Sequence, residues 1–246
     1  MNETAEYIEV NDFAKAYHRL RQKEGRVYSD EEVGSLPHIS ATHQHYKEWQ
    51  MRKLSCNRLV KYLSNYKRAL NILEVGCGNG WLSSKLVAIP NSHITGIDVN
   101  AEELRQAQRV FQNNTNLEFY KRSLQDGLLP GKRFDIIVFA ASIQYFSSLK
   151  DVLQTASGFS KPGGEIHILD SHFYKQGEIS LAKQRSDAYY QSIGFPEMVH
   201  HYFHHSFDQL NSFDYTILYN SGSFTFFMSK NKNPFPWICI KQKMNT

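Results

Sequence analysis

The sequence predicts an α/β fold with a mostly parallel sheet, and residues 71–98 carry that prediction. The apolar run Ile72–Val75 stops at glycines, which indicates a buried strand that ends in a tight turn. Apolar residues then recur at helical spacing over Trp81–Val87, and a second apolar run, Ile94–Ile97, ends in Asp98. Strand, glycine turn, helix, strand and acid in this order form half of a nucleotide-binding α/β unit.

The composition fits a globular protein of one α/β domain with additions. The chain has 246 residues, of which 41% are hydrophobic and 21% are charged. Its net charge of +4 is mild and no long run of like charges occurs, so the sequence does not indicate a nucleic-acid partner. No apolar stretch approaches the roughly 18 residues of a membrane span. The acidic N-terminus also lacks the apolar core of a signal peptide.

Cysteine usage points to a reducing compartment. The three cysteines form no C-x-x-C pair, and Cys77 lies inside the glycine turn. A disulfide framework is therefore not expected. We expect a cytoplasmic protein with no membrane partner and no nucleic-acid partner.

The glycine spacing discriminates between nucleotides. A dinucleotide fingerprint has glycines at its first, third and sixth positions. Gly76 and Gly78 fit this pattern, but the sixth position is Trp81 and the third glycine is Gly80. A bulky indole where helix and strand pack closely argues against an NAD-dependent oxidoreductase, which is one alternative interpretation. A carboxylate at Asp98 can accept both hydroxyls of a ribose.

Residues 74–80, followed by Asp98, resemble the first motif of the class I S-adenosylmethionine-dependent methyltransferases, Glu/Asp-x-Gly-x-Gly-x-Gly. The resemblance implies a Rossmann-like sheet of seven strands with an antiparallel last strand, helices on both faces, an N-terminal helical lid and S-adenosylmethionine as cofactor. It spans about residues 72–241 and includes a weaker likeness to bacterial methyltransferases of unassigned substrate. Ser123 stands where many members carry an adenine-binding Asp. The cofactor-binding residues that it implies are Glu74, Gly76, Cys77, Gly78, Gly80, Trp81, Asp98, Val99, Ser123, Leu124, Ala140 and Ser142.

The rest of the chain is divided accordingly. We expect an N-terminal extension or lid over residues 1–66, and a methyltransferase domain over 67–246 with an insertion at about 171–205. Periodicity predicts helices in the following places: a short one through Phe13, Tyr17 and Leu20, then Thr42–Tyr66, one capped by Asn100, one capped by Ser148, and Ile179–Ile193. Further strands are expected at Leu117–Tyr120, Phe134–Ala140, Glu165–Leu169, Tyr215–Tyr219 and Pro236–Lys241, with a strand or flap at Phe224–Met228.

Candidate catalytic residues follow the fourth and fifth strands, where open α/β sheets place their ligands. His172 is the candidate general base and Tyr145 the candidate acceptor contact. A base is needed only when the acceptor holds its proton tightly, and a lone loop histidine is more often structural. Tyr145, His172, Tyr190 and one or more of His200, His201, His204 and His205 are expected to converge into an aromatic pocket over the carboxyl edge of the sheet.

The histidine-rich run at residues 200–205 has a metal site as its competing interpretation. Adjacent imidazoles diverge on any regular element, and neither a cysteine nor a paired acid accompanies them. Metal ligation needs converging ligands in a fixed geometry. We therefore predict no metal site.

Residues 141–144 narrow the acceptor. They read Ala-Ser-Ile-Gln, not the Asn/Asp-Pro-Pro-Tyr/Phe of enzymes that methylate base amino groups. They hold neither a cysteine nucleophile nor an acidic metal site. The leading hypothesis is methyl transfer to O, N or C of a small molecule by direct in-line displacement. The alternatives are methylation of a protein side chain and a non-catalytic module that binds S-adenosylmethionine or a nucleoside.

Overall fold

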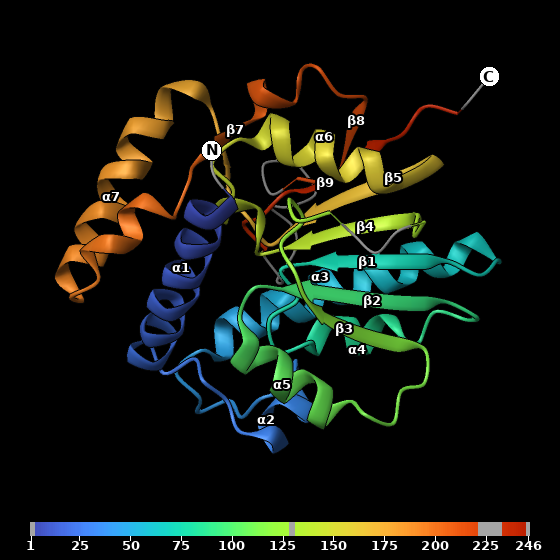
Figure 1. Ribbon diagram of the computed structural model, residues 1–246, viewed down its shortest axis with the longest axis horizontal. Coiled ribbons are helices and arrows are strands. Elements are labelled where there is room, and N and C mark those ends of the chain that lie inside the picture. The colour runs from blue at the N-terminus through green and yellow to red at the C-terminus, as the bar shows by residue number, and fades with distance from the viewer. Residues whose placement is uncertain (1–2, 128–130, 221–232, 245–246) are drawn as a thin grey trace.

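The computed structural model describes residues 3–127, 131–220 and 233–244, and within them seven strands form one sheet in the order β3-β2-β1-β4-β5-β9-β8 (Figure 1). The strands are β1 (Asn71–Val75), β2 (His93–Asp98), β3 (Leu117–Lys121), β4 (Phe134–Ala140), β5 (Ser160–Leu169), β8 (Tyr215–Tyr219) and β9 (Trp237–Lys241). The first five run parallel, and β9 runs antiparallel to both β5 and β8. The predicted mostly parallel sheet with an antiparallel last strand is confirmed.

Helices cover both faces of the sheet, as predicted. The helices are α1 (Glu3–Lys23), α2 (Asp30–Ser35), α3 (Tyr46–Leu63), α4 (Trp81–Leu86), α5 (Ala101–Val110), α6 (Leu149–Phe159) and α7 (Ile179–Ser192). One apolar cluster joins α3, α4 and α5 to side chains such as Ile72, and the other joins α6 to side chains such as Leu73. Neighbouring residues of β1 enter opposite clusters because successive strand side chains point to opposite faces.

A third apolar cluster joins α1 to α7. Ala16 and Leu20 of α1 pack with Tyr190 of α7 and with Met198. Figure 1 shows these two helices side by side at the edge toward which the arrows of β1 and β4 point. Short strands β6 (Phe173–Tyr174) and β7 (His205–Ser206) pair in parallel on either side of the segment that contains α7.

Three predicted boundaries were wrong, each for a local reason. Helix α1 is 21 residues long rather than short, because the prediction rested on the spacing of Phe13, Tyr17 and Leu20 alone. Helix α3 begins at Tyr46 rather than Thr42, and the His45 amide donates to His43 Nδ1 at 3.0 Å, a local bond that competes with helix formation.

Strand β5 begins at Ser160, five residues before its predicted start at Glu165. Its pairing with β4 shifts register between Phe134 and Ile136, so an irregular first segment that contains two glycines still joins the sheet. The strand or flap predicted at Phe224–Met228 lies outside the described residues. Across the described ranges, each helix is too short or too polar to cross a membrane.

Candidate active site

The loop between β1 and α4 adopts a backbone conformation that favours glycine. Gly76, Gly78 and Gly80 all have positive φ angles, of 74°, 52° and 74°. A Cβ on Gly76 would lie 2.5 Å from Cβ of Ser142, which follows β4. The loop runs directly beside the carboxyl end of β4, and this close approach leaves no room for a side chain at residue 76.

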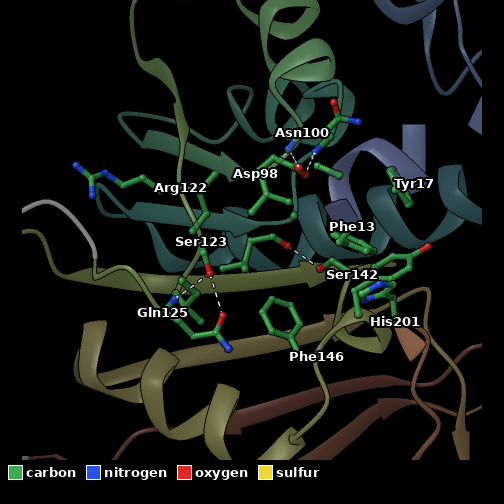
Figure 2. A pocket seen from close by; sticks show the side chains of 18 of the residues that line it. Phe13, Tyr17, Asp98, Asn100, Arg122, Ser123, Gln125, Ser142, Phe146 and His201 are labelled. Atoms are coloured by element: carbon green, nitrogen blue, oxygen red, sulfur yellow. Dashed lines mark hydrogen bonds between the residues drawn. The ribbon is translucent and has the colours of Figure 1, made fainter. Parts of the chain in front are cut away.

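Asp98 ties the glycine loop to the next helix. Its Oδ2 accepts the Gly78 amide at 2.8 Å and its Oδ1 accepts the Asn100 amide at 2.8 Å (Figure 2). Asn100 in turn caps α5, where its side chain accepts the amides of Glu102 and Glu103. The carboxylate at the end of β2 is thereby fixed in orientation.

The carboxyl groups of Asp98 and Glu103 interact at the carboxyl end of β2. Burial raises the pKa of Asp98. Burial, and then the nearby charge of Asp98, raise the pKa of Glu103 to about 7. Glu103 Oε2 accepts the Asn100 side-chain amide at 3.1 Å. The pair resists carrying two negative charges, which favours a ligand that offers hydroxyl donors over one that brings a further anion.

A cavity of about 430 Å³ runs along the carboxyl ends of β1, β2 and β4. Figure 2 shows Asp98, Ser123, Ser142 and Tyr17 around it. The predicted cofactor residues that line it are Gly76, Gly78, Asp98, Val99, Ser123, Leu124 and Ser142. The predicted cofactor residues outside its lining are Glu74, Cys77, Gly80, Trp81 and Ala140.

Three of the residues outside the lining make contacts that stabilise the glycine loop and α4. Glu74 is buried and accepts Ser83 Oγ at 2.5 Å, which joins β1 to α4. Burial raises the pKa of Glu74 to about 8. Trp81 meets Trp49 of α3 edge to face, with ring centroids 5.2 Å apart. Gly80 is the N-cap of α4. We interpret them as supports of the site.

Ser123 lines the cavity in a loop that Asp126 stabilises. The Ser123 amide donates to Asp126 Oδ2 at 2.9 Å, and Ser123 Oγ donates to Gln125 Oε1 at 2.9 Å. The Arg122 amide also donates to the carbonyl of Asp98 at 3.0 Å. The segment after β3 is therefore bound to the end of β2, and it places Ser123 and Leu124 against the cavity.

Several further residues line the cavity without a motif that marks them in the sequence. They are Phe13, Ala14 and Tyr17 of α1 together with Arg122, Gln125, Phe146, Ser147 and Phe203. The one usable signal was the spacing of Phe13 and Tyr17, four residues apart on one helix face. The others belong to loops, where no periodicity marks an inward side chain.

Tyr145 lines this cavity and a second one beside it, whereas His172 lines only the second. The ring of Tyr145 lies 5.5 Å from that of Phe13. His172 packs against Phe235 with ring centroids 4.7 Å apart. Tyr190 also lines the second cavity.

The histidines of residues 200–205 are spread over separate environments. His200 and His201 line the first cavity. His204 Nε2 lies 2.9 Å from Ser186 Oγ, and His205 Nε2 donates to the carbonyl of Ile143 at 3.1 Å. Because these rings do not converge, the run offers no common metal position.

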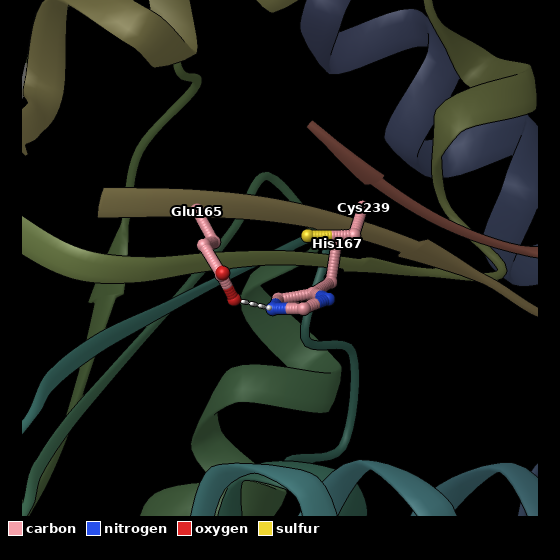
Figure 3. A group of neighbouring side chains, drawn as sticks. All are labelled: Glu165, His167 and Cys239. Carbon is pink, nitrogen blue, oxygen red and sulfur yellow. Dashed lines mark hydrogen bonds and ion pairs between the residues drawn. The ribbon is translucent and has the colours of Figure 1, made fainter. Parts of the chain in front are cut away.

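Among the described residues, Glu165, His167 and Cys239 form the group that comes closest to a metal-binding set (Figure 3). They are buried, on β5 and β9. His167 Nε2 lies 3.1 Å from Glu165 Oε2, and Trp237 Nε1 donates to His167 Nδ1 at 3.1 Å. Since both imidazole nitrogens already have partners, we interpret the group as a polar network within the core.

Comparison with known proteins identifies the family. The sequence profile of a family described as "Methyltransferase domain" matches residues 66–221. The chain belongs to this methyltransferase family. It is also similar to malonyl-[acyl-carrier protein] O-methyltransferase 2 of Ilyobacter polytropus, with 28% identity over 123 residues that cover 49% of this chain and 47% of that protein. A malonyl-[acyl-carrier protein] O-methyltransferase of Acetivibrio thermocellus is 30% identical over 115 residues, which cover 46% and 40%. The chain thus matches about half the length of these relatives or less.

Solved methyltransferase structures share the fold. The plantazolicin methyltransferase BpumL aligns with a TM-score of 0.57 and 13% identity over 96% of this chain and 98% of that one. The magnesium protoporphyrin IX methyltransferase of Synechocystis aligns with a TM-score of 0.59 and 13% identity over 87% and 93%. At such low identity the likeness concerns the fold alone. The expected Rossmann-like fold of the class I S-adenosylmethionine-dependent methyltransferases is confirmed.

Proposed function

We propose that this chain transfers the methyl group of S-adenosylmethionine to O, N or C of a small-molecule acceptor by direct in-line displacement. One observation carries the proposal: Asp98 is held at the rim of the cavity by the Gly78 and Asn100 amides. Each carboxylate oxygen accepts one backbone amide and keeps a lone pair for a ribose hydroxyl. A non-catalytic binding module predicts the same arrangement, so turnover must decide between them.

The residues around the cavity fit the parts of this cofactor. Gly76 and Gly78 present bare backbone to the cavity, so a ligand can approach it closely. Leu124 and Phe146 offer apolar surface for a planar base, and Ser123 offers a hydroxyl beside it. When bound, the cofactor supplies a methyl group activated by a sulfonium.

The chain's own contribution is positioning and the exclusion of water. Phe13 and Tyr17 of α1 cover the cavity, and Tyr145 packs against both rings. Orientation in a water-excluded site can supply much of the roughly 7–11 kcal/mol available from proximity. We accordingly propose residues 1–66 as a lid on a methyltransferase domain over 67–246, with the 171–205 insertion beside it.

Titration calorimetry with S-adenosylhomocysteine tests the cofactor assignment, and radiolabelled S-adenosylmethionine with a panel of metabolites and proteins tests turnover. Binding with turnover on a small molecule supports the proposal. Binding without turnover on any metabolite favours a non-catalytic module, and turnover only on protein favours a side-chain methyltransferase. Absence of binding at millimolar ligand overturns the proposal.

A cytoplasmic location and the absence of a nucleic-acid partner are likewise proposed.

A further inference from the structure

A second cavity adjoins the first. It has a volume of about 450 Å³, and Tyr17, Ala141 and Tyr145 line both cavities. Side chains of α1, α3 and α7 complete its walls. Because the shared residues form a partition between them, a ligand in the second cavity would be a near neighbour of a ligand in the first.

The backbone at the floor of the second cavity adopts an uncommon conformation. Ala141 follows β4 with φ 55° and Asp170 follows β5 with φ 53°, both in the left-handed region although neither is glycine. Both residues line this cavity. Strained non-glycine residues cluster at functional sites, and the carboxyl ends of neighbouring parallel strands are where open α/β sheets bind ligands.

Asp170 connects this floor to α3. Its Oδ1 accepts Ser55 Oγ at 2.5 Å, and the Asn233 side chain donates to the same Ser55 oxygen at 2.7 Å. Ser55 lies three residues after Arg52 on α3. The network therefore fixes the helix that presents Arg52 to the cavity.

The charged groups of the cavity form a ladder in which arginines outnumber carboxylates. Arg21 lies 3.6 Å from Glu24, Glu24 lies 3.2 Å from Arg26, Arg26 lies 2.5 Å from Glu48, and Glu48 lies 3.0 Å from Arg52. These three guanidinium groups share two carboxylates, which leaves one positive charge. All five residues line the second cavity.

Two further charged groups complete the balance. Arg185 of α7 also lines the cavity, and its charge lowers the pKa of the neighbouring His172, after the larger effect of burial. Asp170 is the remaining carboxyl group of the lining, and burial raises its pKa, which favours its neutral form. The second cavity therefore has a positive excess that an anionic ligand would neutralise.

Aromatic rings supply the remaining wall. Tyr145 and Tyr202 meet edge to face with centroids 5.9 Å apart, and Tyr190 and Tyr202 do so at 5.8 Å. Burial raises the pKa of all three hydroxyl groups, so they remain neutral hydrogen-bond donors. A planar aromatic ligand can pack against such rings edge to face or offset-stacked.

We propose that the second cavity binds the methyl acceptor and that this acceptor is a small planar organic acid whose carboxylate pairs with Arg52 and Arg185. The inference rests on the proposed methyltransferase function, because it assigns the first cavity to the cofactor. It adds the chemical class of the acceptor.

Three benzene derivatives of similar size and different charge test the proposal in the full chain saturated with S-adenosylhomocysteine. The compounds are benzoate, benzamide and benzylamine, each titrated calorimetrically at constant ionic strength. We expect benzoate to bind at least about tenfold more tightly than the neutral amide, as expected for a charge-assisted hydrogen bond. Equal binding of benzoate and benzamide, tighter binding of benzylamine, or no binding of benzoate at millimolar concentration overturns the proposal.

Two arginine variants and one matched control locate the effect. Arg52→Gln and Arg185→Gln should each weaken benzoate binding about ten- to a hundredfold while S-adenosylhomocysteine affinity stays unchanged. Lys183→Gln removes the same charge from the exposed surface of α7 and should change neither affinity. Unchanged benzoate binding in both arginine variants overturns the proposal, whereas failure of S-adenosylhomocysteine to bind the wild-type chain overturns the proposed function instead.

Discussion

The rings of Tyr17 and Tyr145 meet edge to face, with centroids 5.4 Å apart and an interplanar angle of 82°. Tyr17 comes from α1 and Tyr145 from the turn after β4, so the contact joins the N-terminal helix to the carboxyl edge of the sheet. Both residues line both cavities. Closure of the cofactor cavity and separation of the two cavities therefore depend on the same pair of rings.

Tyr17→Ala should weaken the closure over the first cavity. We expect S-adenosylhomocysteine to dissociate several-fold faster, because an aromatic contact worth roughly 0.5–1.5 kcal/mol and the cover it provides are lost together. Stopped-flow fluorescence measures the rate. Lys15→Ala changes an exposed position of the same helix and should leave the rate unchanged. Equal dissociation rates in Tyr17→Ala and wild type would show that α1 is not a lid.

Asp98→Ala should lower the affinity for S-adenosylhomocysteine by about ten- to a hundredfold, since a charge-assisted hydrogen bond contributes roughly 1.5–3 kcal/mol. The variant also loses the bonds that hold the Gly78 and Asn100 amides. Calorimetry measures the affinity, and circular dichroism checks the fold. Asp151→Ala, on the exposed side of α6, is the control. Full affinity in a folded Asp98→Ala protein would remove Asp98 from the site.

The cofactor side of the site was predictable because its signals are local in sequence. The glycines at 76, 78 and 80 and the acid at 98 belong to one strand-turn-helix-strand unit, so their spacing alone brings them together. Trp81 shows the limit of that reasoning. It belongs to the motif, yet it packs against Trp49 and lies outside the cavity lining, because the direction of its side chain depends on a helix distant in sequence.

The second cavity could not be read from the sequence for the same reason. Arg52 of α3 is far in sequence from Asp170, which follows β5, and from Arg185 of α7, and no period or spacing relates the three residues. His172 was singled out because it follows a strand; its predicted role as a base remains a prediction. The left-handed backbone at Asp170 has no sequence signal either, since Asp occupies this region only occasionally.

Glu74→Gln should change how stability depends on pH. The pKa of Glu74 is raised by burial from 4.5 to about 8, so the folded chain holds a proton that the unfolded chain releases between these values. The unfolded state then binds fewer protons, and the free energy of unfolding falls as pH rises through that window. Above pH 8, the free energy of unfolding of the wild type should be a few kcal/mol lower than at pH 4.5.

The glutamine variant keeps an oxygen that can accept Ser83 Oγ and cannot ionise. We therefore expect a smaller loss of stability with rising pH than in the wild type, measured by urea denaturation at a series of pH values. Glu102→Gln, at an exposed position of α5, serves as the control and should follow the wild type. Parallel stability curves for Glu74→Gln and wild type would contradict a protonated Glu74.

Glu165, His167 and Cys239 form a buried group in which a hydrogen bond already joins the histidine to the glutamate. If hydrogen bonds rather than a metal hold it together, purified protein should contain no stoichiometric zinc, and EDTA should not lower the melting temperature. His167→Ala should lower the free energy of unfolding by roughly 2–5 kcal/mol. It leaves the indole of Trp237 without its acceptor and removes a partner of the Glu165 carboxylate, although Tyr62 still donates to that carboxylate at 3.1 Å. His93→Ala, at an exposed position of β2, is the control and should cost little. Stoichiometric zinc, together with a chelator-induced drop in melting temperature, would contradict this interpretation.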